Sequence, residues 1–168
     1  GDINSPFLNY YRVAVRKPET IVRKNGIPMT GLINNFYYEY SSTGGDINND
    51  GLQDLFFALI LESDKIYLNE GGLKFKDITD KAGVAGGKEW ASGVTIVDIN
   101  ADGWDDIYIS CHFWDDIEKR RNKLYINNKN NTFTEKAKEY GIDDIGYSFK
   151  SRFFEMDIAG FLQLFVAN

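Results

Sequence analysis

A nine-residue pattern that occurs twice constrains this chain more than any other feature of the sequence. One copy runs from Asp46 to Asp54 and the other from Asp98 to Asp106, and both read D-x-N-x-D-G-x-x-D. Oxygen-bearing side chains at positions 1, 3, 5 and 9 can converge on one hard cation, and the glycine at position 6 permits a sharp turn. The pattern therefore predicts two calcium-binding loops.

Each predicted site combines three carboxylates, one amide and the backbone carbonyl of position 7. We expect bound calcium to be structural, because it would neutralise clustered carboxylates whose mutual repulsion opposes folding. The expected ligands of the first site are Asp46, Asn48, Asp50, Leu52 and Asp54, and those of the second are Asp98, Asn100, Asp102, Trp104 and Asp106.

An EF-hand shares the first six positions, but it needs a glutamate at position 12 and a helix on each side of the loop. Position 12 is Phe57 in one copy and Ile109 in the other. Both copies continue into apolar, aromatic and β-branched residues that are typical of buried strands, so we expect the loops to lie between strands. Ordinary turns remain the structural alternative, because Asp, Asn and Gly are common turn residues.

Composition favours a strand-rich globular protein. Aromatic residues make up 15% of the 168 residues, and the net charge of −6 argues against a nucleic-acid partner. No apolar run reaches the roughly 18 residues of a transmembrane helix. The single cysteine, Cys111, excludes an intrachain disulfide, and its neighbour His112 should point to the opposite face of a strand, half exposed.

Short strand-like runs separated by turn residues follow one another along the chain. Residues 1–41 form a poorly defined strand and loop region, in which residues 35–40 are a strand candidate that leads through 41–45 into the first loop. Further strands are expected at 55–60, 65–69, 73–78, 94–97 and 107–110, with an irregular or one-turn helical link at 79–84.

The strand order then repeats. Residues 123–127 match residues 65–69, Phe133 matches Phe75, and residues 140–142 match 82–84, all at an offset of 58 residues. A repeat of this length with about four short strands is typical of a β-propeller blade. We therefore predict an all-β propeller segment over residues 42–168, with about three four-stranded blades that start near 46, 98 and 155. Closed propellers have four or more blades, so further blades are expected in the same or another chain.

The third unit and one long insertion depart from the repeat. When Gly160 is aligned with Gly51, Glu155 and Asp157 occupy positions 1 and 3, but positions 5 and 9 lack acidic residues. This loop should bind calcium weakly or not at all. The insertion at 113–122 is the best candidate for a partner contact, although it could be only a solvated charged loop. Its candidate contact residues are Trp114, Arg120 and Arg121.

These motifs resemble the FG-GAP/VCBS repeat proteins, and most of all the bacterial relatives of cartilage acidic protein of the ASPIC/UnbV type. The resemblance rests on the two loops, the strand starts that follow them, and the L-Y-x-N…F-T-E…G-I hairpin, and it covers roughly residues 42–168. It implies an integrin-α-like propeller with calcium in the inter-strand loops. It also implies an exported protein, commonly a surface lipoprotein or an adhesin, whose signal peptide or lipid anchor is not among the residues given.

The expected function is a calcium-stabilised extracellular binding, adhesion or surface-assembly module, on the outer cell surface or in the periplasm. Its ligand would be a protein or a glycan. One alternative is a glycan-binding nutrient-capture lipoprotein that uses Trp90, Trp104 and Trp114 as stacking platforms. Another is a glycan-degrading enzyme in the propeller channel, but the Asp clusters are already explained by metal binding and no catalytic motif occurs. We expect no enzyme activity in this segment.

Overall fold

The computed structural model describes residues 39–167 apart from 61, 88, 113–115 and 156–161. The described chain is mostly antiparallel β-structure, arranged as two four-stranded sheets and one two-stranded hairpin. The expected all-β fold is confirmed, and these sheets do not close into a ring. Of the three expected blades, two show all four strands and the third shows two.

The elements follow the same order in both four-stranded sheets. The first sheet consists of β1 (Glu39–Gly45), β2 (Asp54–Leu59), β3 (Lys65–Asn69) and β4 (Phe75–Asp77), and the helix α1 (Thr79–Ala82) follows it. The second sheet consists of β5 (Ala91–Val97), β6 (Asp106–Cys111), β7 (Lys123–Asn127) and β8 (Phe133–Glu135), with the 3₁₀ helix η1 (Glu118–Arg120) before β7 and the helix α2 (Ala137–Tyr140) after β8. The hairpin consists of β9 (Lys150–Glu155) and β10 (Leu162–Ala167).

The two sheets also share their strand register, which confirms the repeat at the level of hydrogen-bonded pairs. Tyr67 in β3 lies between Leu55 and Asp77 on the neighbouring strands. Tyr125 in β7 has the same relation to its neighbours in β6 and β8. Each outer strand is followed by a one-turn helix that ends at a left-handed glycine, Gly83 or Gly141.

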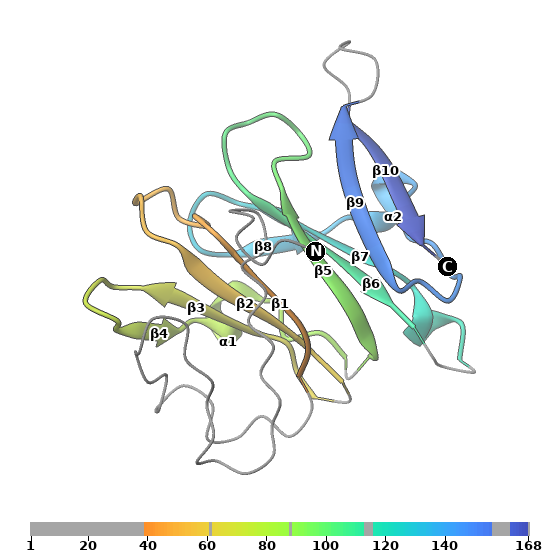
Figure 1. Cartoon of the computed structure of the whole chain (residues 1–168), viewed down its shortest axis with the longest axis horizontal. Helices are drawn as coiled ribbons and strands as arrows, with labels where there is room; N and C mark the ends of the chain where they lie inside the picture. The colour runs from red at the N-terminus through yellow and green to blue at the C-terminus, as the bar shows by residue number, and fades with distance from the viewer. Residues whose placement is uncertain (1–38, 61, 88, 113–115, 156–161, 168) are drawn as a thin grey trace, which may run out of the picture.

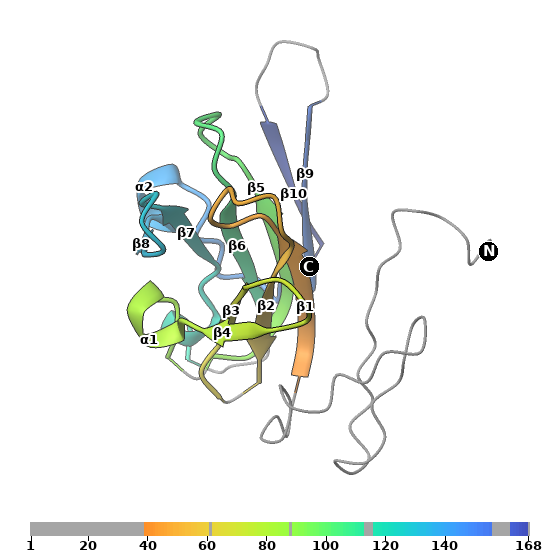
Figure 2. The ribbon, with the colours of Figure 1, turned by 90° about the vertical axis from the view of Figure 1, so that its left-hand side faces the viewer.

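The sheets lie side by side in chain order, from β1–β4 through β5–β8 to the hairpin (Figure 1). Figure 2 shows β1, β5 and β9 on one side of the molecule, and α1 and α2 on the other. Apolar side chains fill the space between the sheets: Phe56 of β2 and Ile107 of β6 are fully buried in the largest cluster. Tyr108, on the opposite face of β6, packs edge-on against Phe153 of the hairpin, with ring centroids 5.5 Å apart. Each sheet therefore buries apolar side chains against its neighbour.

Strand β1 runs further than expected. Residues 41–45, which we interpreted as a connection, are part of the strand and pair with β2. Their small side chains gave little strand signal, but small residues are what this position requires. A Cβ on Gly45 would lie 2.8 Å from Cγ2 of Ile96 and 2.9 Å from Oδ2 of Asp105, so only glycine allows β1 to approach the second sheet this closely.

His112 is buried, and the expectation of a half-exposed imidazole was wrong. Its ring lies 4.1 Å from that of Phe149 and 5.5 Å from that of Tyr147, measured between centroids. Both aromatic residues belong to the segment before β9, which the strand pattern around residue 112 could not place. Cys111 beside it is buried and free, as expected.

A cluster of ionisable side chains, in which Asp64 is buried and Glu89 and Lys123 are half-buried, lies at the end of the sheets opposite to the nine-residue loops. Oδ1 of Asp64 accepts the N–H of Leu59 at 2.9 Å, and Glu89 forms an ion pair with Lys123. Burial raises the pKa of Asp64 to about 7; the Leu59 N–H opposes this shift, the charge of Glu89 adds to it, and Lys123 opposes it. Asp64 is therefore a buried acid that holds its proton in the folded protein more tightly than in the unfolded chain.

The Asp64→Asn variant tests this assignment through the pH dependence of stability. Because the folded-state pKa lies above the ordinary value of 3.8, protonation stabilises the fold fully below pH ~4, and this contribution is lost as the pH rises through about 7. The variant keeps an acceptor for Leu59 and has no such loss. Between pH 5 and pH 8, urea unfolding should show the variant gaining about 2 kcal/mol relative to the parent protein. Asp80→Asn, at an exposed aspartate, should not change the slope, and equal slopes for parent and Asp64→Asn would contradict the assignment.

Candidate metal centre

The two nine-residue loops occupy equivalent turns of the two sheets. The first loop (46–54) begins directly after β1 and ends with the first residue of β2, and the second loop (98–106) joins β5 to β6 in the same way. The loops therefore lie between antiparallel strands, as predicted, and the EF-hand alternative is excluded for both.

In the first loop, three side chains turn inward onto the loop's own backbone. Asp46 accepts the N–H groups of Asp50 and Gly51 at 3.0 and 2.8 Å, through its two carboxylate oxygens. Asn48 accepts the N–H of Asp50 at 3.1 Å, and Asp50 accepts the N–H of Leu52 at 2.8 Å. The side-chain oxygens of positions 1, 3 and 5 therefore gather around one tight turn.

The second loop repeats this arrangement bond for bond. Asp98 accepts the N–H groups of Asp102 and Gly103 at 3.0 and 2.8 Å. Asn100 accepts the N–H of Asp102 at 3.1 Å, and Asp102 accepts the N–H of Trp104 at 3.0 Å. Equal bonds at equal positions show that the repeated sequence produces a repeated local structure.

The aspartate at position 9 is buried in both loops, and it joins each loop to the end of the third strand of its sheet. Asp54 accepts the N–H of Ile47 at 3.0 Å and that of Asn69 at 2.7 Å. Asp106 accepts the N–H of Ile99 at 3.1 Å and the N–H of the residue that ends β7 at 2.8 Å. Each carboxylate thus holds the start of its own loop and the end of the third strand.

These two carboxyl groups carry a raised pKa. Burial is the main cause for both, and it raises the pKa of Asp106 to about 6. The backbone N–H groups oppose the shift, and the negative charges at positions 5 and 1 of the same loop add to it. In the first loop, the negative charges of Asp50 and Asp46 raise the pKa of Asp54 in the same way. Each loop therefore concentrates negative charge around a buried carboxylate.

The donor chemistry fits a hard cation such as calcium. Carboxylate and amide oxygens are its preferred ligands, and a carboxylate oxygen that accepts one hydrogen bond keeps a second lone pair. Within the described part of the chain, no group of three or more His, Cys, Asp or Glu side chains is arranged, as it stands, to hold a metal ion, so these side chains would have to turn toward a bound cation. Asp46, Asn48, Asp50 and Asp54 would hold calcium in the first loop, and Asp98, Asn100, Asp102 and Asp106 in the second. The carbonyl ligands at Leu52 and Trp104 stay predictions.

A lysine beside the second loop has no counterpart beside the first. Lys129, in the turn between β7 and β8, places its ammonium 3.2 Å from Oδ2 of Asp102. The equivalent position of the first sheet is Gly71, which has no side chain. Both residues have a positive φ, of 64° and 78°. The second loop thus has a lysine ammonium beside one of its predicted calcium ligands, and the first loop has none at the equivalent position.

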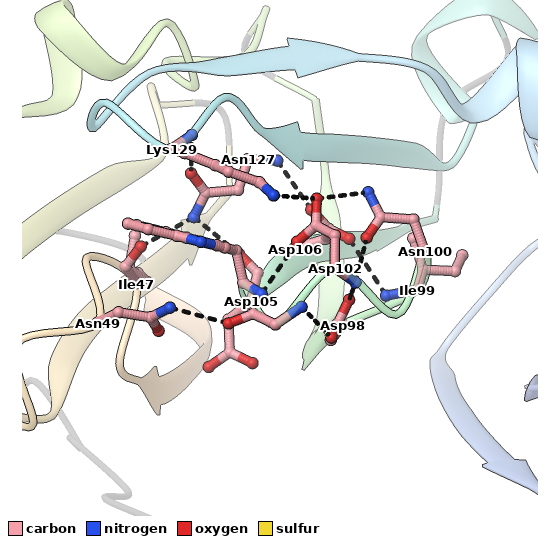
Figure 3. Close-up of polar contacts among 12 residues, drawn as sticks. Ile47, Asn49, Asp98, Ile99, Asn100, Asp102, Asp105, Asp106, Asn127 and Lys129 are labelled. Atoms are coloured by element: carbon pink, nitrogen blue, oxygen red, sulfur yellow. Dashed lines mark hydrogen bonds and ion pairs between the residues drawn. The ribbon is translucent and has the colours of Figure 1, made fainter.

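Three further residues join the loops to each other, and the motif did not single them out (Figure 3). They are Asn49, Asp105 and Asn127. Asn127 ends the run L-Y-I-N, which matches the run I-Y-L-N that ends at Asn69, so this repetition was a signal that could have been used. Asn49 and Asp105 fall at unspecified positions of the pattern, and nothing in the sequence distinguishes them.

The remaining candidate residues belong to the third unit and to the insertion at 113–122. Trp114 and Asp157 fall outside the described residues, and Glu155 is the last residue of β9. Arg120 donates from Nε to the carbonyl of Ile145 at 2.7 Å, and its guanidinium lies 4.3 Å from the ring centre of Tyr147.

Arg121 is likewise engaged within the chain. Its guanidinium lies 2.8 Å from Glu118 and 2.6 Å from Asp143. Both arginines of the insertion therefore hold the chain that leads into β9. A partner contact there stays a prediction.

Backbone strain at the second loop can be tested without metal, in the presence of a chelator. Gly103 has φ 83° and open space where a Cβ would be, whereas Ala101 has φ 57°. Gly103→Ala should lower the free energy of unfolding by about 1 kcal/mol, because the left-handed region disfavours side chains. Ala101→Gly should raise it, by up to about 1 kcal/mol. Urea unfolding gives both values, and changes of the same sign would contradict the loop conformation.

Comparison with known proteins agrees with this architecture. Residues 46–109 match the family model of the FG-GAP-like repeat. An 81-residue segment is 32% identical to integrin alpha pat-2 of Caenorhabditis elegans and 30% identical to integrin alpha pat-2 of Caenorhabditis briggsae. Each alignment covers 46% of this chain and 7% of the relative, so the chain spans only a small part of those proteins. The matched segment 46–109 contains both loops and the strands β2 to β5, and it is similar to an FG-GAP-like repeat.

Proposed function

We propose that this chain is a calcium-stabilised propeller segment that serves as an extracellular binding, adhesion or surface-assembly module. One observation carries the proposal: the two loops repeat the same bonds around a buried carboxylate at position 9. A turn needs no buried acid of this kind. A cation site does, because the cation would offset both the burial of the acid and its repulsion by neighbouring carboxylates.

Calcium in this proposal is structural. Each loop joins the first and second strands of a sheet, and position 9 also holds the end of the third strand. Binding at a loop would therefore stabilise three strands together. Free calcium at about 100 times its dissociation constant would add about 2.7 kcal/mol for each site, a large share of the stability of a domain.

The extracellular location and the surface ligand are proposed from the similarity to integrin alpha chains. Within the described part of the chain, no helix combines the length and apolar character needed to cross a bilayer. The hairpin β9–β10 corresponds to the first two strands of a sheet. We therefore propose further blades, in the same or another chain, and a protein or glycan partner at the cell surface.

Of the three tryptophans considered for glycan stacking, two lie among the described residues and are far apart along one hairpin. Trp90 precedes β5 and Trp104 precedes β6, so the antiparallel pairing of these strands places them at opposite ends of one hairpin. For the enzyme alternative, the relevant feature of the described residues is a cleft of about 530 Å³ beside Tyr108, whose polar groups form hydrogen bonds and an ion pair within its own lining. Arg121 pairs with Asp143, and the Tyr108 hydroxyl donates to the carbonyl of Ile142. We propose no catalytic role for the described residues.

Thermal unfolding with calcium and with a chelator tests the proposal. Calcium at about 100 times its dissociation constant should raise the melting temperature by roughly 10 °C when both loops bind. Asp50→Ala and Asp102→Ala should each remove at least half of that rise, because each removes a position-5 ligand from one loop. Differential scanning calorimetry measures both effects.

Asp80→Ala is the matched control, since it removes an exposed aspartate outside the loops. It should leave the calcium-dependent rise unchanged. A folded parent protein whose melting temperature does not respond to calcium would show that the loops are only turns.

The ammonium of Lys129 should make the second loop the weaker calcium site. Lys129→Gly installs the residue found at the equivalent position of the first sheet and suits the positive φ. Calcium affinity of the second loop should rise about 3- to 10-fold, because a competing cation is removed. Isothermal titration in an Asp50→Ala background isolates that loop. Lys74→Gly, in the matching turn of the first sheet, should have no effect, and an unchanged affinity in Lys129→Gly would refute the competition.

A further inference from the structure

The two loops are in direct contact with each other as well as with their own sheets. The side-chain amide of Asn49, at position 4 of the first loop, donates to the carbonyl of Gly103, at position 6 of the second, at 2.8 Å. This contact joins the turns of the two loops (Figure 3). Neither Asn49 nor Gly103 is a predicted calcium ligand, so this hydrogen bond leaves every predicted ligand available.

Asp105 makes the second connection. Its half-buried carboxylate accepts the backbone N–H of Asp46, the first ligand position of the other loop. It is also close enough to Asp46 and Asp98 to feel the charge of both. Asp105 therefore lies between the first ligand positions of the two loops, whereas its counterpart in the first loop is the neutral Gln53.

Asn127 makes the third connection. Its side-chain amide donates to the carbonyl of Ile47 at 2.8 Å and to that of Asp105 at 3.1 Å. Its backbone N–H donates to the position-9 carboxylate of Asp106 at 2.8 Å. Asn127 is buried, and it bonds both to Asp106 of the second loop and to the backbone of the first loop.

We infer that Asn49, Asp105 and Asn127 make the two loops a single coupled unit, in which ordering one loop orders the other. The inference rests on the proposed function for its calcium consequence, namely positive cooperativity between the two sites. Asp105 is a positioning residue here: it fixes the backbone of Asp46 and is not counted as a ligand. Its negative charge would also lessen the repulsion between two bound cations.

Isothermal titration of the chain with calcium tests the coupling. The parent protein should bind the second calcium at least about 5-fold more tightly than the first, with a Hill coefficient above 1. Asp105→Ala should still bind two ions, but independently. Asp105→Asn keeps an acceptor for the Asp46 N–H and should retain part of the cooperativity. Gln53→Ala, at the equivalent position of the first loop, is the matched control and should behave as the parent protein does.

A metal-free measurement separates failure of the coupling from failure of the proposed function. In chelator, amide hydrogen exchange at Asp50 and Gly51 reports on order in the first loop, because both N–H groups bond to Asp46. Asp102→Ala, a lesion in the second loop, should accelerate their exchange at least about 5-fold, and Asp80→Ala should not.

Each outcome decides one of the two proposals. Two independent sites in the parent protein, or undiminished cooperativity in Asp105→Ala, would overturn the coupling and leave calcium binding intact. No calcium binding at all would overturn the proposed function, and the exchange measurement would then decide the coupling alone. If Asp102→Ala leaves amide exchange at Asp50 and Gly51 unchanged, the coupling between the loops is overturned.

Discussion

The structure depends most on the buried carboxylate at the base of each loop. Asp54 and Asp106 are inaccessible to solvent, and each accepts two backbone N–H groups from different parts of its sheet. A buried carboxylate without such partners would be costly, so the loop, the second strand and the end of the third strand must come together as one unit. The same group adds to the negative charge of the loop, and the proposed calcium site rests on that charge.

Packing between sheets then turns these units into an array. The faces of β2 and β6 that carry Phe56 and Ile107 are buried against each other, and the hairpin continues the order with Phe153 against Tyr108. Contact between the loops follows from this stacking, because loops at equivalent turns of neighbouring sheets are brought side by side. The connection through Asp105 and Asn127 is thus a consequence of blade packing as well as of loop sequence.

Much of the fold could be read from the sequence, because strand patterns and turn residues act locally. The expected strand at 65–69 has the observed bounds, and the one-turn helix after the fourth strand was anticipated. The errors occurred where tertiary contacts override local preference. Residues 41–45 are small and polar, yet they form a strand because β1 must approach Ile96 and Asp105 closely. His112 is buried because Phe149 and Tyr147, distant in sequence, cover it.

The sequence by itself determined the two loops, their predicted ligands and the repeated four-stranded unit, since a turn that bonds to its own backbone needs only its own residues. The tertiary structure alone decided which groups lie between the loops. Asn49 and Gly103 are 54 residues apart, and Asp105 and Asp46 are 59 residues apart, so each pair meets only when the sheets stack. It also placed Lys129 on Asp102, through a turn that the loop motif does not include. Local hydrogen bonding made the sites predictable, and packing between blades determined how they are connected.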